Sequence, residues 1–182
     1  MEMTIKELMI PIGEYVTVST TDTLAQYFQA LEADKAAKGG AHCHRDALVM
    51  GPGGQVTGKV TMHDVFLALE PTYKSIMESM SDTSVLTPDY LAGIYKDFNL
   101  WAKPLPRLCE RAAQITVGDI MHKPGAAEFV DEADPVDVGL HRYVMGVHQP
   151  LLVRGPDGRV SGVLRFGDVF KRVKDMTLSC SL

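Results

Sequence analysis

The sequence predicts an α/β protein that contains two tandem β-α-β-β-α repeats, because two blocks of the chain recur at fixed shifts. Residues 51–66 read GPGGQVTGKVTMHDVF and residues 155–170 read GPDGRVSGVLRFGDVF; eight of these sixteen positions are identical, whereas average residue usage gives roughly one. VSTTDTL at 18–24 aligns with VDEADPV at 130–136 at a shift of 112 instead of 104. The first copy therefore carries an insertion of eight residues, which we place around residues 33–41.

Each copy is expected to begin with a short strand and a helix. The strands are predicted at 15–18 and 128–130, where the residues are β-prone. Asp22 and Asp134 are predicted to cap the helices that follow, and Pro135 is predicted at the first helical position.

A β-hairpin and a final helix are expected to complete each copy. The first helix is predicted over 23–38, and glycines end it. GPGG and GPDG are turn sequences, because glycine and proline satisfy the backbone constraints of a tight reversal. The last helices open near Met62 and Phe166. The hairpin strands are predicted at 47–50, 56–60, 151–154 and 160–164.

Residues 71–114 match neither copy and are predicted to form a helical connector between a first repeat at 1–70 and a second repeat with a C-terminal tail at 115–182. Thr87-Pro88-Asp89 is typical of a helix start. A second short helix is expected over 107–113. We interpret the apolar stripe of the first connector helix as packing against the repeats or a second subunit rather than as a cofactor site. The stripe consists of Tyr90, Leu91, Ile94, Phe98 and Trp101, and Pro104 and Pro106 are expected to end this helix.

Composition excludes several classes of function. The formal net charge is −5 and the pI is about 5.6, which disfavours general binding to nucleic acid or to an anionic membrane. No apolar run approaches the length of a membrane span, and the charged residues of 1–12 disfavour a signal peptide. Three widely spaced cysteines are typical of reduced thiols. We therefore expect a cytoplasmic protein.

The doubled motif resembles the CBS domain family. Each copy ends in a glycine, two further strand residues and, six positions after the glycine, an aspartate before a helix: Gly58 to Asp64, and Gly162 to Asp168. With DTL and DPV upstream, a tandem pair of such units is similar to the arrangement called a Bateman module. The resemblance covers about residues 3–70 and 115–176. It implies pseudo-two-fold symmetry between the repeats and a sensing function rather than catalysis.

The resemblance also implies a ligand and its contacts. CBS pairs commonly bind AMP, ADP, ATP or another adenosyl ligand in the cleft between repeats, so an adenine nucleotide is the expected regulatory ligand, and no obligatory cofactor is expected. Asp64 and Asp168 are expected to accept hydrogen bonds from the ribose hydroxyls, because a carboxylate offers two acceptor oxygens to a vicinal diol. Thr61 is expected at the phosphates. Arg165 replaces the matching threonine, and either clamps phosphate, which we favour, or fills the second site.

The adenine contacts implied by the resemblance come from the segments before the second strand and from the first strands. Small side chains at three of these positions leave room for a purine, whereas Tyr15 and His42 either stack on the ring or block it. The residues at these positions are Tyr15, His42, Cys43, Ala127, Gly146 and Val147.

Lys59 stands where the family usually has an apolar residue. Because neighbouring residues on a strand face opposite ways, we interpret it as a solvated lysine, with a phosphate ligand as the alternative.

The run His42-Cys43-His44, with His63 and His148 elsewhere, offers zinc-ligand chemistry but lacks a spaced ligand pair. These histidines are therefore interpreted as surface or pocket-lining residues, and no metal is expected. No GxSxG, HExxH or GxxxxGK(S/T) motif is present, so no enzymatic activity is expected.

Two hypotheses of function follow. The first is a regulatory module that senses adenine nucleotides. The second is a dimerisation or protein-interaction scaffold with degenerate, empty sites. Both include a homodimer and an unidentified protein target.

Overall fold

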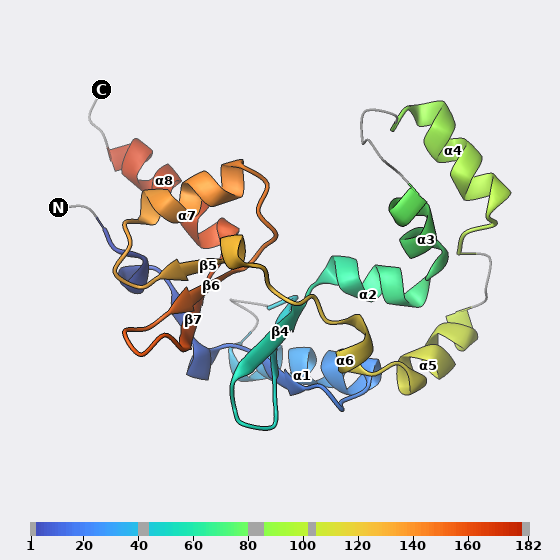
Figure 1. The fold of residues 1–182 in the computed structure, drawn as a ribbon, viewed down its shortest axis with the longest axis horizontal. Helices are drawn as coiled ribbons and strands as arrows, with labels where there is room; N and C mark the ends of the chain where they lie inside the picture. The colour runs from blue at the N-terminus through green and yellow to red at the C-terminus, as the bar shows by residue number, and fades with distance from the viewer. Residues whose placement is uncertain (1–2, 40–43, 80–85, 102–104, 180–182) are drawn as a thin grey trace.

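A computed structural model describes residues 3–39, 44–79, 86–101 and 105–179 of the chain. These residues form two small sheets with helices packed on them, and a helical segment that extends away from the sheets (Figure 1). Within the described ranges, no helix is both long enough and apolar enough to cross a bilayer. In chain order the elements are η1 (Ile5–Glu7), β1 (Ile10–Pro11), η2 (Ile12–Glu14), β2 (Thr17–Ser19), α1 (Leu24–Ala37), β3 (Ala47–Met50), β4 (Val56–Val60), α2 (Met62–Leu69), α3 (Thr72–Ser79), α4 (Pro88–Asp97), α5 (Leu105–Gln114), α6 (Val117–Ile120), η4 (Ala126–Glu128), β5 (Phe129–Asp131), α7 (Val136–Val144), β6 (Leu151–Arg154), β7 (Val160–Leu164) and α8 (Phe166–Ser179).

The predicted fold class is confirmed: both repeats follow the order β-α-β-β-α. The four hairpin strands have the predicted bounds, and the turns between them contain Gly54 at φ +72° and Gly158 at φ +76°, a backbone region that favours glycine. The insertion placed around residues 33–41 lengthens α1 to 14 residues, against 9 in α7.

The predicted helix caps are wrong. Asp22 accepts a hydrogen bond from the backbone N–H of Ser19 at 2.7 Å, so its carboxylate closes the turn before α1. Thr23 is the actual N-cap, and its hydroxyl accepts from the N–H of Gln26. In the second repeat Pro135 is itself the N-cap rather than the first helical residue. The aspartates therefore stabilise the turn between the strand and the helix instead of capping the helix itself.

Each sheet takes a segment from the other half of the chain. The first sheet has the order β2-β3-β4 and the second has the order β1-β7-β6-β5, so that N-terminal β1 pairs antiparallel with β7. Reciprocally, His122 forms an isolated antiparallel bridge with Lys59 at the edge of β4. The same exchange is seen in two backbone hydrogen bonds between equivalent positions, which are 112 residues apart in the two repeats. The N–H of Ile5 donates to the carbonyl of Asp134, and the N–H of Val117 donates to the carbonyl of Asp22.

The strands β3 and β6 are buried on both faces. Alternate residues point to opposite sides of a strand, so Ala47 and Val49 join the core of the first repeat while Leu48 points toward the second repeat. In the second repeat, alternate residues of β6 likewise join its own core and point toward the first repeat. A third cluster therefore lies between the two sheets; its buried members are Tyr15, Leu48, Leu152 and Val163.

The glycines of the repeated motif lie where the segment from the other half of the chain packs against the strand, and no side chain fits there. A Cβ on Gly162 would lie 2.6 Å from the backbone oxygen of Ile10, and a Cβ on Gly58 would lie 3.0 Å from that of His122. Both are closer than ordinary contact. Glycine at these positions lets the exchanged segment approach the strand.

The connector differs in part from expectation. Thr87 is the N-cap of α4 as predicted, but the helix ends at Asp97. Asn99 and Trp101 have positive φ angles, which turn the chain so that Leu100 is buried. Pro106, predicted to end this helix, lies instead in the first turn of α5.

The apolar stripe of α4 is largely exposed in the described chain. Tyr90, Leu91 and Phe98 are exposed, and α4 lies beyond α3, away from both sheets (Figure 1). Trp101 is a stripe residue that packs on the first repeat, since its ring meets that of Phe66 edge-on; its Nε1 donates to the hydroxyl of Tyr73 on α3 of the connector. The expected packing on the repeats is thus limited to one end of the stripe.

We predict that Gly162→Ala lowers the free energy of unfolding by about 1–3 kcal/mol, because the new methyl group collides with backbone that cannot rotate away. Gly167→Ala is the matched control, since nothing lies within 4 Å of its Cβ position and alanine favours a helix. Urea unfolding monitored by circular dichroism measures both. Equal stabilities for the two variants would contradict the close approach.

Candidate functional site

Two cavities lie between the repeats, and each joins the motif of one repeat to a segment of the other. We name them after the residue that follows the last strand: the Arg165 cavity, of about 410 Å³, and the Thr61 cavity, of about 460 Å³. Both volumes lie in the usual range of small-molecule sites. The Arg165 cavity is lined by Leu8, Ile10, Glu14, Lys38, His44, Arg165, Asp168, Lys171, Arg172 and Asp175. The Thr61 cavity is lined by Arg45, Asp46, Thr61, Met62, His63, Tyr143, Gly146, Val147, His148, Gln149 and Phe166.

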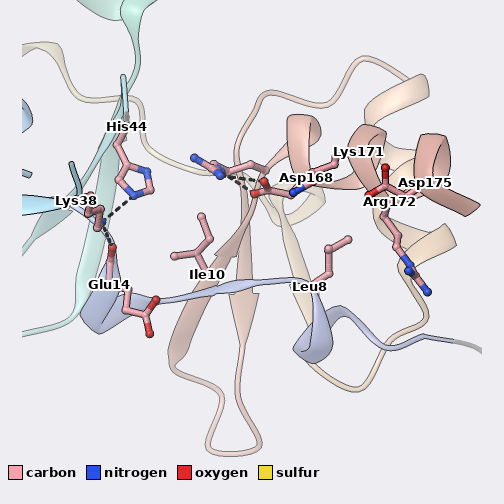
Figure 2. Close-up of a pocket in the computed structure, with 10 residues that line it drawn as sticks. Leu8, Ile10, Glu14, Lys38, His44, Asp168, Lys171, Arg172 and Asp175 are labelled. Atoms are coloured by element: carbon pink, nitrogen blue, oxygen red, sulfur yellow. Dashed lines mark hydrogen bonds and ion pairs between the residues drawn. The ribbon is translucent and has the colours of Figure 1, made fainter. Parts of the chain in front are cut away.

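In the Arg165 cavity, side chains from both repeats face one another. Figure 2 shows Lys38 and His44 of the first repeat on one side and Asp168 and Lys171 of α8 on the other. Lys38 is held in place because its Nζ contacts Asp34 at 2.6 Å. Cations outnumber carboxylates among the lining residues, which favours an anionic ligand.

Arg165 forms a bidentate pair with Asp168. Its Nε donates to Oδ2 at 2.6 Å and its Nη2 donates to Oδ1 at 2.9 Å, so both carboxylate oxygens expected at a ribose already have a partner. This pairing raises the pKa of Arg165. Arg165 therefore contacts the motif aspartate directly, an arrangement that neither of the two interpretations from the sequence included.

Sequence reasoning missed the other cations of this cavity. Lys171 and Arg172 follow Asp168 by three and four residues, which places all three on one side of α8. That helical spacing was the available signal. Lys38 carried no such signal, because the fold brings it to α8 from the other repeat. His44, interpreted from the sequence as a surface or pocket-lining residue, is buried and lines this cavity.

The Thr61 cavity contains three of the predicted site residues: Thr61, Gly146 and Val147. Thr61 is the N-cap of α2, and its backbone N–H and hydroxyl both donate to Oδ2 of Asp64, at 2.8 and 2.7 Å. Asp64 is half-buried and is not among the lining residues. Its Oδ1 receives no hydrogen bond from the described residues and is the oxygen left for a ligand.

Two further predicted adenine contacts, Tyr15 and Ala127, do not line either cavity. Tyr15 is buried in the cluster between the sheets; its hydroxyl donates to Asp46, its ring lies 4.3 Å from that of His44, and burial raises its pKa. Ala127 is exposed, and its carbonyl accepts from Arg142 at 2.8 Å. His42 and Cys43 lie outside the described residues.

Both interpretations of Lys59 are wrong, because Lys59 is fully buried. It occupies the position that Val163 occupies in the second repeat, on the strand face that points toward the other repeat. Its Nζ pairs with Glu128 at 2.6 Å and donates to the backbone carbonyls of His148 and Pro150 at 2.8 and 2.7 Å. The lysine therefore joins the two repeats.

Glu128 is the centre of a polar cluster around this lysine. Burial alone raises the pKa of its carboxyl, but hydrogen bonds from Lys59, from His122 and from the N–H of Gly125 outweigh burial and lower the pKa to about 2. Burial lowers the pKa of Lys59, and the bond to Glu128 partly offsets that shift. No sequence signal predicts the pair of Lys59 and Glu128, because its members are distant in the chain.

Comparison with known proteins identifies the fold. No protein-family model and no curated protein matches this sequence. Among solved structures, the chain is similar to the CBS-pair protein CBSX2 from Arabidopsis thaliana, with 17% identity and a TM-score of 0.63 over 99% of this chain and 100% of that one. The described architecture is therefore that of a CBS domain pair.

Two further similar structures contain nucleotides. A structure of CBSX2 in complex with AMP is 20% identical, with a TM-score of 0.60 over 96% of this chain and 98% of that one. The CBS domain of a bacterial CNNM/CorC family Mg²⁺ transporter in complex with ATP is 16% identical, with a TM-score of 0.55 over 94% and 87%.

We predict that Lys59→Met lowers the free energy of unfolding by about 3–5 kcal/mol, because it leaves the carboxylate of Glu128 buried without its cation. Adding Glu128→Gln removes that charge, so the double variant loses less stability than Lys59→Met alone. Lys123→Met, at an exposed position, is the control. Urea denaturation measures all three; a loss below about 1 kcal/mol for Lys59→Met would refute the buried pair.

Proposed function

We propose that this chain is a non-catalytic regulatory module that senses AMP, ADP, ATP or another adenosyl ligand in the cavities between its repeats. The observation that carries the proposal is that each cavity is built from both repeats. A ligand held there contacts both halves at once, so it stabilises one arrangement of the repeats over another. The similar structures with AMP and ATP support an adenine nucleotide.

The two cavities differ in charge, and this difference supports different roles. The Arg165 cavity adds Lys38, Lys171 and Arg172 to the guanidinium of Arg165, which suits a polyphosphate. The Thr61 cavity offers Thr61 at the N-terminal end of α2 and the small Gly146, and Asp64, which is bonded to Thr61, keeps Oδ1 for a ligand that reaches past the threonine; this suits a nucleoside with few phosphates. We propose that ATP prefers the first cavity and AMP the second.

A specific observation favours the second candidate function, a ligand-free scaffold. Both motif aspartates already have internal partners: Asp64 holds Thr61, and Asp168 holds Arg165 in a bidentate pair. A ribose would have to compete for the carboxylate of Asp168. In the scaffold, these bonds are permanent and the cavities stay empty.

A homodimer and an unidentified protein target belong to either candidate. Phe66 on α2 and Phe170 on α8 occupy matching positions of the two repeats, and these residues are 56% and 66% exposed. Burial of such a pair of apolar surfaces supports association of two copies. Light scattering of the purified chain, with and without ATP, measures the assembly. We propose the cytoplasm as its location.

We predict that AMP and ATP bind the purified chain at submillimolar concentration, measured by isothermal titration calorimetry and thermal shift. Asp64→Asn keeps one oxygen for the helix cap but removes the charged acceptor, so AMP affinity falls by about 10–100-fold. Asp119→Asn is the matched control, because Asp119 forms the same box with Thr116 on α6, and Thr116, unlike Thr61, lines neither cavity. No heat and no thermal shift with any adenosyl ligand at millimolar concentration would favour the scaffold.

For Arg165, we predict that Arg165→Thr, the residue found at the matching position 61, weakens ATP binding by about tenfold or more, while adenosine binding changes little. The reason is that the guanidinium contacts phosphate rather than the nucleoside. Arg159→Thr, at an exposed turn, is the control for the change in net charge. Tighter ATP binding in Arg165→Thr would instead mean that the arginine blocks the site.

A further inference from the structure

Three potential metal ligands converge beside the junction of the repeats. One ligand atom from each of His122, Glu128 and His148 lies within 4.8 Å of the others. His122 is paired with the edge of β4 through backbone hydrogen bonds to Lys59, Glu128 is on η4, and His148 precedes β6. Three separate segments thus bring their side chains to one place.

The carboxylate of Glu128 is oriented by two neighbours. The backbone N–H of Gly125 donates to Oε1 at 2.9 Å, and the ammonium of Lys59 lies 2.6 Å from Oε2. His122 Nε2 lies 2.7 Å from Oε1 and 2.9 Å from Oε2, so it faces both oxygens. A carboxylate has about four lone-pair positions, and the two that face His122 are those open to a cation.

His148 completes the set with a nitrogen that is otherwise unused. Its Nδ1 is buried, has no hydrogen-bond partner among the described residues, and lies 3.7 Å from Oε2 of Glu128. A buried ring nitrogen without a partner is unfavourable, and such an atom calls for a ligand or an ion. The ring is held in place by stacking on that of His122, with 4.1 Å between centroids.

We propose that His122, Glu128 and His148 form a binding site for a divalent transition metal ion, for which Zn²⁺ is the best match. Two imidazole nitrogens and one carboxylate are ligands that zinc prefers, and a water completes four-coordination. Ligand atoms around one tetrahedral zinc are about 3.4 Å apart, so small side-chain rotations close the site. Binding replaces the proton that His122 Nε2 shares with Glu128, and that proton moves to Nδ1 or to solvent.

Lys59 is compatible with this site but lowers its affinity. Its Nζ is directed to Oε2 and to the carbonyls of His148 and Pro150, and these three contacts fix its position and leave Oε1 to His122 and Gly125. The metal would join the edge of the first sheet to η4 and to His148, which also lines the Thr61 cavity. This role is separate from nucleotide sensing and does not depend on it.

The test is a titration of the full chain, stripped of metal with a chelator, with Zn²⁺ in competition with a chromophoric indicator and with Co²⁺ followed by visible absorption. One ion per chain is expected to bind, and Co²⁺ is expected to give the intense bands of a four-coordinate site. His148→Phe keeps the ring stack and removes both nitrogens, so affinity falls about tenfold or more. His122→Gln is expected to have the same effect.

Two controls make the outcome decisive. His141→Phe changes an exposed histidine outside the cluster and should leave affinity unchanged. The double variant His42→Gln, Cys43→Ser should also bind normally. Circular dichroism verifies the fold of each variant, and His148→Phe breaks no hydrogen bond of Nδ1 within the described part of the chain. The proposal is overturned if the parent chain binds no Zn²⁺ or Co²⁺, if His148→Phe binds as tightly as the parent, or if only the 42/43 variant loses binding.

Discussion

The burial of the central strands on both faces is the constraint on which the rest of this structure depends. A strand covered on one face can place polar residues on the other, but here Leu48 and Leu152 point from β3 and β6 into a shared cluster while their neighbours fill the separate cores. Lys59 must enter the same layer because β4 pairs with β3. A cation there is tolerated only with a buried anion and further acceptors, and Glu128 and two carbonyls supply them.

The local features of the fold could be predicted from the sequence. Hairpin bounds follow from β-prone residues on either side of GPGG and GPDG, and these interactions span only a few residues. The predicted cap of α1 was wrong because two neighbouring residues, Asp22 and Thr23, are both good helix caps. Asp22 bonds within the turn, and Thr23, which follows the turn, caps the helix. The end of α4 at Asp97 depends on positive φ angles at Asn99, which asparagine tolerates well, and at Trp101, a residue type that does not predict such an angle.

The candidate site could be predicted only in part, because its parts come together across the chain. Thr61, Gly146 and Val147 share a cavity as a pair of repeats implies, although the sequence did not show which segment faces which motif. The contact of Arg165 with Asp168 was foreseeable, since residues three apart at a helix start lie side by side. The partner of Lys59 was not, because pairing between distant residues depends on how the two sheets meet.

The reciprocal exchange of segments has a consequence for the order of folding during synthesis. The ribosome releases the N-terminus first, yet Ile5 belongs to the core of the second repeat and β1 pairs with β7. The first core in turn lacks Val117 until the connector has emerged. Neither core can be completed while the chain is half made: the first waits for Val117, whereas the second core and the cluster between the sheets wait for the last strand.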